Sequence, residues 1–260
     1  MDNITLSAEE IIVIASTLGI SEVYGVPNVF KNYTQNQLFS RIDEVKNKLI
    51  EKEVLQVSFS KGICVNEKVK TLLHPLLLCD KFISLDRRIN NRKNDYVVIY
   101  VCEEESLMAV YENSLFRLST YKLECESFIR DVLVCNKDVK QEEINMTMTI
   151  EELKMLQENS DYEKELIKEG KQKQAIELIN KTFASIANYY SFSFVIPKKT
   201  HNGFKNIMII DDLMGKLKLE TSIKEDYTDS ITIVSTTSEE IVNEISNNIN
   251  WIKGENICQV

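Results

Sequence analysis

The feature that most constrains the fold of this chain is a repeated order of helix and strand signals. Ser7 followed by Glu10 forms a capping box at the start of an apolar helical pattern. A second capping box, Thr149 followed by Glu152, opens a similar pattern in the second half. Repetition on this scale predicts a pseudo-symmetric fold.

The ends of the two halves also match, at an offset of 116 residues. This offset aligns Ser119-Thr120 with Ser235-Thr236, Leu118 with Val234, Ile129 with Ile245 and Leu133 with Ile249. A strand, a turn and a helix are therefore expected to close each half. The alternative is a chance match between two amphipathic patterns.

Periodicity predicts the remaining elements. In the first half, helices are expected at 7–18, 35–52 and 66–79, with strands at 96–102, 107–111 and 115–118. Pro75 would kink or divide the third of these helices. In the second half, the capped helix should be followed by a helix at 172–190 and by strands at 191–196, 205–210, 214–223 and 230–234. On that long helix Glu177 and Lys181 would form a favourable pair one turn apart.

These elements predict an α+β fold in which two pseudo-twofold-related halves form a central, mostly antiparallel β-sheet with flanking helices. The N-terminal half would span residues 1–140, with extra helical material between about 60 and 92. The C-terminal half would span 141–260 and repeat the sheet-plus-helix unit. Together they are expected to form one integrated globular domain.

Composition predicts a soluble cytoplasmic protein. The longest apolar candidate for a membrane segment, 11–14, is far shorter than the roughly 20 residues needed to span a bilayer. The six cysteines form no CxxC pair, which indicates free thiols in a reducing compartment. The net charge is −9, so the chain should repel nucleic acid. The basic residues between Lys81 and Lys93 are expected to form a solvated linker before a strand.

No pattern for catalysis, cofactor binding or metal binding is present in the sequence. His74 and His201 lack partners at metal-ligand spacing, and His74 with Cys79 is only a weak pair. His74 is expected to be a core or helix-end histidine. The sequence contains no phosphate loop, GxGxxG or GxSxG motif. Asp211-Asp212 and Glu103-Glu104-Glu105 follow strands, but acids are common in such turns. We therefore expect no enzyme activity and no cofactor.

Three stretches of the sequence resemble the EspG family of type VII secretion. They are "ITLSAEEIIVIASTLG", the loop "VYGVP", and "IDEVKNKLIEKEVLQVSFSKGICVNEKVKTLL", followed by strands and a closing helix. The resemblance covers about residues 4–252. The Lys-, Asn- and Ile-rich composition departs from the better-known members, as does the absence of their arginine-rich second half.

The resemblance implies a cytosolic secretion chaperone or substrate adaptor. Such a protein would hold a helical-hairpin secretion substrate, or a toxin-associated helical protein, by its apolar tip and keep it export-competent. The implied partner is a secreted helical protein of the WXG or LXG type or its complex, with the secretion ATPase as a further contact. Neither nucleic acid nor membrane insertion is implied.

The strongest candidates for partner contact are Leu213, Met214, Leu217 and Leu219. A methionine among leucines suits a surface that accommodates apolar partners. Leu217 and Leu219 fit an inward-facing strand better, whereas Leu213 and Met214 lie beside acids and a glycine, as exposed contacts would.

Two other functions are compatible with parts of the sequence. Residues 35–73 offer a helix, a short strand pair around Gly62 and a further helix, and could form a winged-helix DNA-binding module, although its presumed recognition helix offers only Lys68 and Lys70. A small-molecule enzyme could be centred on Asp211 and Asp212. Salt-sensitive duplex binding would favour the first of these, and unchanged biological activity of an Asp211→Asn, Asp212→Asn double variant would remove the second.

Overall fold

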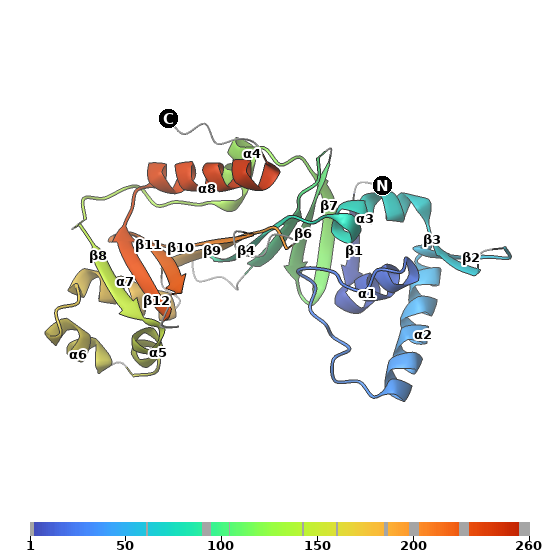
Figure 1. Ribbon diagram of the computed structural model, residues 1–260, viewed down its shortest axis with the longest axis horizontal. Coiled ribbons are helices and arrows are strands. Elements are labelled where there is room, and N and C mark those ends of the chain that lie inside the picture. Colours follow the sequence, from blue (N-terminus) through green and yellow to red (C-terminus); the bar gives the residue numbers. More distant parts are fainter. Residues whose placement is uncertain are drawn as a thin grey trace. The chain divides into compact units, whose positions relative to one another are not determined.

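The computed structural model of this chain describes residues 3–60, 62–89, 95–103, 105–141, 143–159, 161–184, 187–197, 203–223 and 229–254. The protein has the predicted α+β fold, a large central antiparallel β-sheet with flanking helices (Figure 1). Two compact units are present, Met1–Ser84 with Tyr96–Leu123 and Leu85–Asp95 with Glu124–Val260. Their bounds differ from the expected division at residue 140. No helix in the described ranges is long and apolar enough to cross a membrane.

The first unit contains a four-stranded antiparallel arrangement in the order β1-β7-β6-β5. Its elements are β1 (Asn3–Ser7), α1 (Ala8–Thr17), α2 (Gln35–Glu51), β2 (Leu55–Ser58), β3 (Gly62–Val65), α3 (Glu67–Leu78), the start of β4 (Phe82–Arg88), β5 (Asp95–Tyr100), β6 (Ser106–Glu112) and β7 (Leu115–Tyr121). Strands β2 and β3 form a separate hairpin. Pro75 lies inside α3 but does not divide it.

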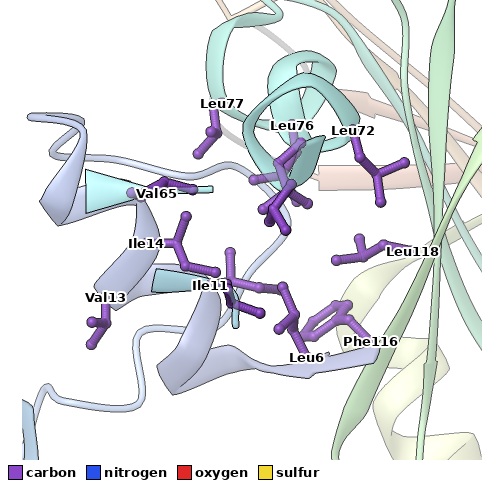
Figure 2. Close-up of a cluster of buried hydrophobic side chains, with 14 of the residues drawn as sticks. Leu6, Ile11, Val13, Ile14, Val65, Leu72, Leu76, Leu77, Phe116 and Leu118 are labelled. Carbon is purple, nitrogen blue, oxygen red and sulfur yellow. The ribbon is translucent and has the colours of Figure 1, made fainter. Parts of the chain in front are cut away.

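The core of the first unit forms where β1 passes directly into α1. The predicted capping box is present: Glu10 accepts a hydrogen bond from the Ser7 amide at 2.8 Å, and Ser7 Oγ accepts one from the Glu10 amide. This turn directs α1 back over the sheet, so that Ile11 and Ile14 pack with apolar side chains of β1, β7 and α3 (Figure 2). Glu10 is itself buried, and its carboxylate lies 2.5 Å from Lys52 Nζ.

The second unit contains a five-stranded antiparallel arrangement in the order β9-β10-β11-β12-β8. Its elements are the rest of β4, α4 (Cys125–Val132), β8 (Asn145–Thr149), α5 (Ile150–Glu158), α6 (Tyr162–Lys168), α7 (Lys173–Phe183), β9 (Asn188–Val195), β10 (Phe204–Asp212), β11 (Gly215–Ile223), β12 (Asp229–Ser235) and α8 (Ser238–Lys253). Helices α5, α6 and α7 share one apolar core with the sheet, and α4 and α8 contact each other.

The two units repeat one arrangement of strands and side chains. In each, a short strand runs into a capped helix and pairs with the last strand of a meander, β1 with β7 and β8 with β12. Leu6 lies opposite Phe116 in the first unit, just as Met148 lies opposite Ile231 in the second. All four side chains are buried. The repeat predicted from the sequence is therefore present in the strand pairing.

The predicted offset between the repeats is wrong by one residue in the closing strand. Leu118 lies opposite Ile4, and its equivalent in the second unit is Ile233, which lies opposite Met146. Because neighbouring residues of a strand point to opposite faces, the predicted match of Leu118 with Val234 aligned the wrong face. Ser119-Thr120, expected in a turn, belongs to β7.

The predicted helix at 172–190 ends early, and β9 takes its last residues. Helix α7 stops at Phe183, and β9 begins at Asn188. Buried aromatic side chains then alternate along β9, at Tyr190, Phe192 and Phe194. This period of two is typical of a strand and explains the change of structure. Strands β1 and β8 and helix α6 were not predicted.

The predicted linker at residues 81–93 contains a strand instead. Leu85 of β4 is buried. The guanidinium of Arg87 donates hydrogen bonds to the carbonyl oxygens of Asp131 and Val132, at 3.1 and 2.9 Å, and Arg88 donates to that of Thr182. Both arginines thus bind carbonyls of the second unit. Arg92 and Lys93 lie outside the described residues.

Candidate functional site

The turn between β10 and β11 carries the exposed half of the predicted contact residues. Leu213 is 77% exposed and Met214 39% exposed. Leu217 and Leu219 follow in β11 but are buried, at 0% and 6%, in the core beneath α5 to α7. The predicted group of four therefore separates into two core residues and an exposed pair, Leu213 and Met214, which we call the apolar turn.

Helix α7 contacts the apolar turn from one side. Lys181 Nζ lies 2.7 Å from Asp212 Oδ1 and 3.0 Å from Met214 Sδ. Gln174 Nε2 donates to the carbonyl oxygen of Met214 at 3.2 Å. The same Asp212 oxygen accepts a hydrogen bond from the Met214 amide at 3.0 Å. Side-chain contacts therefore hold the Asp212 carboxylate before Leu213 and the Met214 backbone after it.

A buried charge cluster holds the other side of the same hairpin. Lys216 is only 2% exposed, and its Nζ lies 2.8 Å from Asp138 Oδ1, 2.7 Å from the Asn136 carbonyl oxygen and 3.4 Å from Asp211 Oδ1. Asp211 also accepts a hydrogen bond from the Asn136 amide at 2.8 Å. Since the buried lysine has oxygen partners on two segments, it ties the hairpin to the connection between α4 and β8.

That connection lies against the backbone of the turn. Gln141 Oε1 accepts a hydrogen bond from the Lys216 amide at 2.7 Å, and its Nε2 donates to the Lys216 carbonyl oxygen at 3.0 Å. Gly215 has a φ of +150°, which other residues rarely adopt, and a Cβ atom there would lie 1.8 Å from Gln141 Oε1, so a larger residue would displace this side chain. An adjoining polar cavity of about 370 Å³ is lined by both acidic and basic side chains, including Lys140 and Glu240.

The surroundings of this cluster favour a charged Asp138 and uncharged Tyr190 and Cys135 side chains. Hydrogen bonds from Lys216 and Ser238 lower the pKa of Asp138 below its ordinary value. Burial raises the pKa of the Tyr190 phenol to about 12 and that of the Cys135 thiol above its ordinary value. At neutral pH these two groups therefore keep their protons, and Lys216 faces carboxylates.

Comparison of the two units shows that the apolar turn is not required by the fold. Tyr100 pairs with Leu107 as Ile210 pairs with Leu217, so the same number of residues separates the two strands of each pair. Pairing continues to Asp212 and Gly215 in the second unit, whereas β5 ends at Tyr100 and β6 begins at Ser106. In this register Glu103 corresponds to Leu213. Because the first unit has an acid at this position, the strand register does not explain the exposed leucine of the second unit.

The acidic candidates have structural partners. Asp211 and Asp212 pair with Lys216 and Lys181 respectively. Glu103 is exposed in its loop, and the structure of Glu104 is outside the described residues. Asp211 and Asp212 therefore have the ion pairs expected of acids that stabilise a hairpin.

The histidines do not form a metal site in the described residues. His74 lies at an exposed position of α3, and not at the buried or helix-end position that its sequence context favours. His201 lies outside the described residues. Among the residues that are described, no three His, Cys, Asp or Glu side chains are grouped so that they could hold a metal ion.

The segment considered as a winged helix contains the predicted order, α2, β2, β3 and α3, but with an apolar hairpin. Val57 is 71% exposed, and Phe59 and Ile63 are also exposed. On α3, Lys70 lies 3.8 Å from Glu67, which partly neutralises it. An apolar wing beside a partly neutralised helix is poorly suited to a phosphate backbone.

The residues that support the apolar turn are not apparent from the sequence. Helical spacing predicts a surface pair between Lys181 and Glu177, whereas Lys181 contacts Asp212 and Met214. The burial of Lys216 was not predicted either, because its partners lie about 75 to 80 residues earlier in the chain. No signal local to either lysine identifies these partners.

Comparisons with known proteins identify a fold. No protein-family profile matches the sequence, and no curated protein matches it either. The structure is similar to that of the Mycobacterium tuberculosis type VII secretion system chaperone EspG5, solved in complex with a PE25–PPE41 dimer. The TM-score is 0.61 at 12% sequence identity, and the match covers 95% of this chain and 96% of that chain.

A solved hypothetical protein gives a TM-score of only 0.16 at 11% sequence identity. At 12% identity the likeness to EspG5 concerns the fold. The chain thus has an EspG-like fold.

Proposed function

We propose that this protein is a chaperone-like adaptor that binds a helical secreted protein through the apolar turn, Leu213 and Met214. The observation that carries the proposal is an exposed, well-anchored apolar pair on an EspG-like fold. The EspG5 structure holds a PE25–PPE41 dimer, which makes a secreted helical protein the best-supported class of partner.

The surroundings of the apolar turn fit reversible binding of an apolar tip. Leu213 projects from a turn that is held on both strands: Asp212 pairs with Lys181 of α7, and the Lys216 amide donates to Gln141 of the α4–β8 connection. Such a rigid contact loses little conformational entropy when it binds. An apolar tip covered in this way could no longer self-associate.

The finer parts of the proposal rest on the resemblance of the sequence to the EspG family. We assign the partner to small helical secreted proteins of the WXG or LXG type, or to toxin-associated helical proteins. Binding would take place in the cytoplasm, without bond-making chemistry or a cofactor, and the bound complex would then reach the secretion ATPase.

Co-expression with the helical proteins encoded next to this gene tests the proposal. We expect one of them to co-purify with this chain and to gain solubility. Replacing Leu213 by Asp places a charge at the contact and should weaken binding at least tenfold, because a central apolar contact contributes about 1–2 kcal/mol or more. Affinity is measured by titration calorimetry with the co-purified protein.

Leu115→Asp is the matched control. Leu115 is 42% exposed and also follows a hairpin turn, but it lies in the first unit. The Leu115→Asp substitution should leave the affinity for the helical protein unchanged. If no neighbouring helical protein binds the wild-type chain, the proposed function is wrong. Equal losses for both variants would show instead that the apolar turn is not the contact.

A further inference from the structure

We infer that Lys181 and Gln174 of α7 are positioning residues that hold the apolar turn in its docking conformation before any partner arrives. This inference deepens the proposed function and rests on it for its biological meaning. Its physical content concerns the free protein, where it can be tested alone.

The contacts come from one face of α7. Gln174 and Lys181 are seven residues apart, which is two helical turns, so their side chains lie on the same side of the helix. Gln174 reaches the Met214 carbonyl oxygen, while Lys181 reaches the Asp212 carboxylate and the Met214 sulfur. Three groups of a four-residue turn are thus bound to a single helix.

Asp212 makes Lys181 the more important of the two. The Asp212 side chain is only 9% exposed, and it pairs with Lys181 while it accepts the Met214 amide. Without the ammonium group, a mostly buried carboxylate would lose its ion-pair partner and move toward water. The Met214 amide would then lose its acceptor, and the turn would sample other conformations.

The corresponding loops of the two units carry different residues, which supports a specific role for the contacts that hold the apolar turn. Glu103, at the position of Leu213, is an exposed acid that water can solvate without support. Leu213 gains nothing from water at 77% exposure, so a clamp that keeps it outward has a use only when another apolar surface covers it.

Hydrogen exchange of the Met214 amide, followed by NMR on the full chain, tests the clamp. Lys181→Met should speed exchange about fivefold, the change expected when one partly exposed ion pair is lost. Lys181→Arg, which keeps the charge and the donors, should restore slow exchange. Lys173→Met is the matched control, because Lys173 forms an exposed pair with Glu177 on the same helix, at 3.6 Å.

The thermal midpoint separates positioning from a general effect on folding. Lys181→Met should shift it no more than Lys173→Met does, while only the former changes exchange at the turn. If Lys181→Met leaves Met214 exchange at the wild-type rate, or if Lys173→Met speeds it equally, the inference is wrong.

Affinity for the co-purified helical protein tests the consequence separately. Lys181→Met should weaken binding about fivefold in the wild-type background, and much less in the Leu213→Ala background, where the positioned side chain is gone. Fast exchange with unchanged affinity would confirm the clamp but contradict its role in docking. Absence of any helical partner would contradict the proposed function, whereas the exchange rates of the free protein would still decide whether the clamp exists.

Discussion

Lys216 is the residue that most distinguishes the second unit from its repeat. In the first unit the equivalent hairpin positions hold Val101 and Ser106, whereas the second unit places Asp211 and Lys216 there. Both charged side chains are almost fully buried. A buried pair gives little net stability, but removing one partner leaves an unpaired charge in the interior. The pair therefore selects one register of β10, β11 and the α4–β8 connection.

The pKa of Asp138 makes this cluster sensitive to acid. Because Lys216 and Ser238 lower that pKa in the folded protein, the contribution of Asp138 to stability is full above its unfolded value of about 3.9 and is lost as pH falls through the lower, folded value. We predict that Asp138→Asn is less stable than wild type at neutral pH. The difference should shrink below about pH 4. Urea unfolding at a series of pH values measures it.

Asp161 provides the control for this pH dependence. Its pKa is also lowered, by Lys164, but the pair is fully exposed on α6. Asp161→Asn should therefore change stability little at any pH. A stability difference for Asp138→Asn that stays constant down to acid pH would show that its carboxylate charge is not the cause.

The helix starts that were best predicted from the sequence are those with capping boxes. The boxes at Ser7 and Thr149 were predicted, and both are present with reciprocal hydrogen bonds. Both capping glutamates also contact a lysine further along the chain: Lys52 lies 2.5 Å from Glu10, and Lys171 lies 3.4 Å from Glu152. The repeat therefore extends to the contacts that orient each first helix.

Removal of either cap should cost a similar and modest amount of stability. We predict that Ser7→Ala and Thr149→Ala each lower the free energy of unfolding by about 1 kcal/mol, because one helix amide loses its side-chain acceptor. Lys154→Ala, at an exposed position of α5, should change it by less than about 0.5 kcal/mol. Urea denaturation measures all three. Equal effects of the three substitutions would contradict the capping explanation.

The elements that the sequence does not predict depend on contacts remote in sequence. The caps and the exposure of Leu213 could be predicted, because neighbouring residues determine both. The end of α7 could not, since Ala184 to Asn188 continue an acceptable helical pattern until the alternating aromatic residues of β9. The supporting partners of Lys181 and Lys216 could not be predicted either, because they lie about 30 and 80 residues away.

At the scale of the whole molecule, the two units interrupt each other in sequence. Residues Leu85–Asp95 belong to the second unit, although they lie within the part of the chain that builds the first. A division at residue 140, as the repeat suggests, would leave the second unit without the arginines of β4. The order of elements in the sequence therefore shows the repeat but not the composition of each compact unit.

This interruption predicts that residues 124–260 do not form a stable second unit alone. Without β4, the Thr182 and Val132 carbonyl oxygens lose their arginine donors, and β9 becomes an open edge beside its row of buried aromatic rings. We expect fragment 124–260 to unfold at lower urea than the same region does in the full chain. Addition of fragment 1–123, which carries Arg87 and Arg88, should restore part of the loss, whereas the same fragment with both arginines replaced by Met should restore less. Circular dichroism measures each transition, and a full-chain midpoint for fragment 124–260 alone would contradict the assignment of β4 to the second unit.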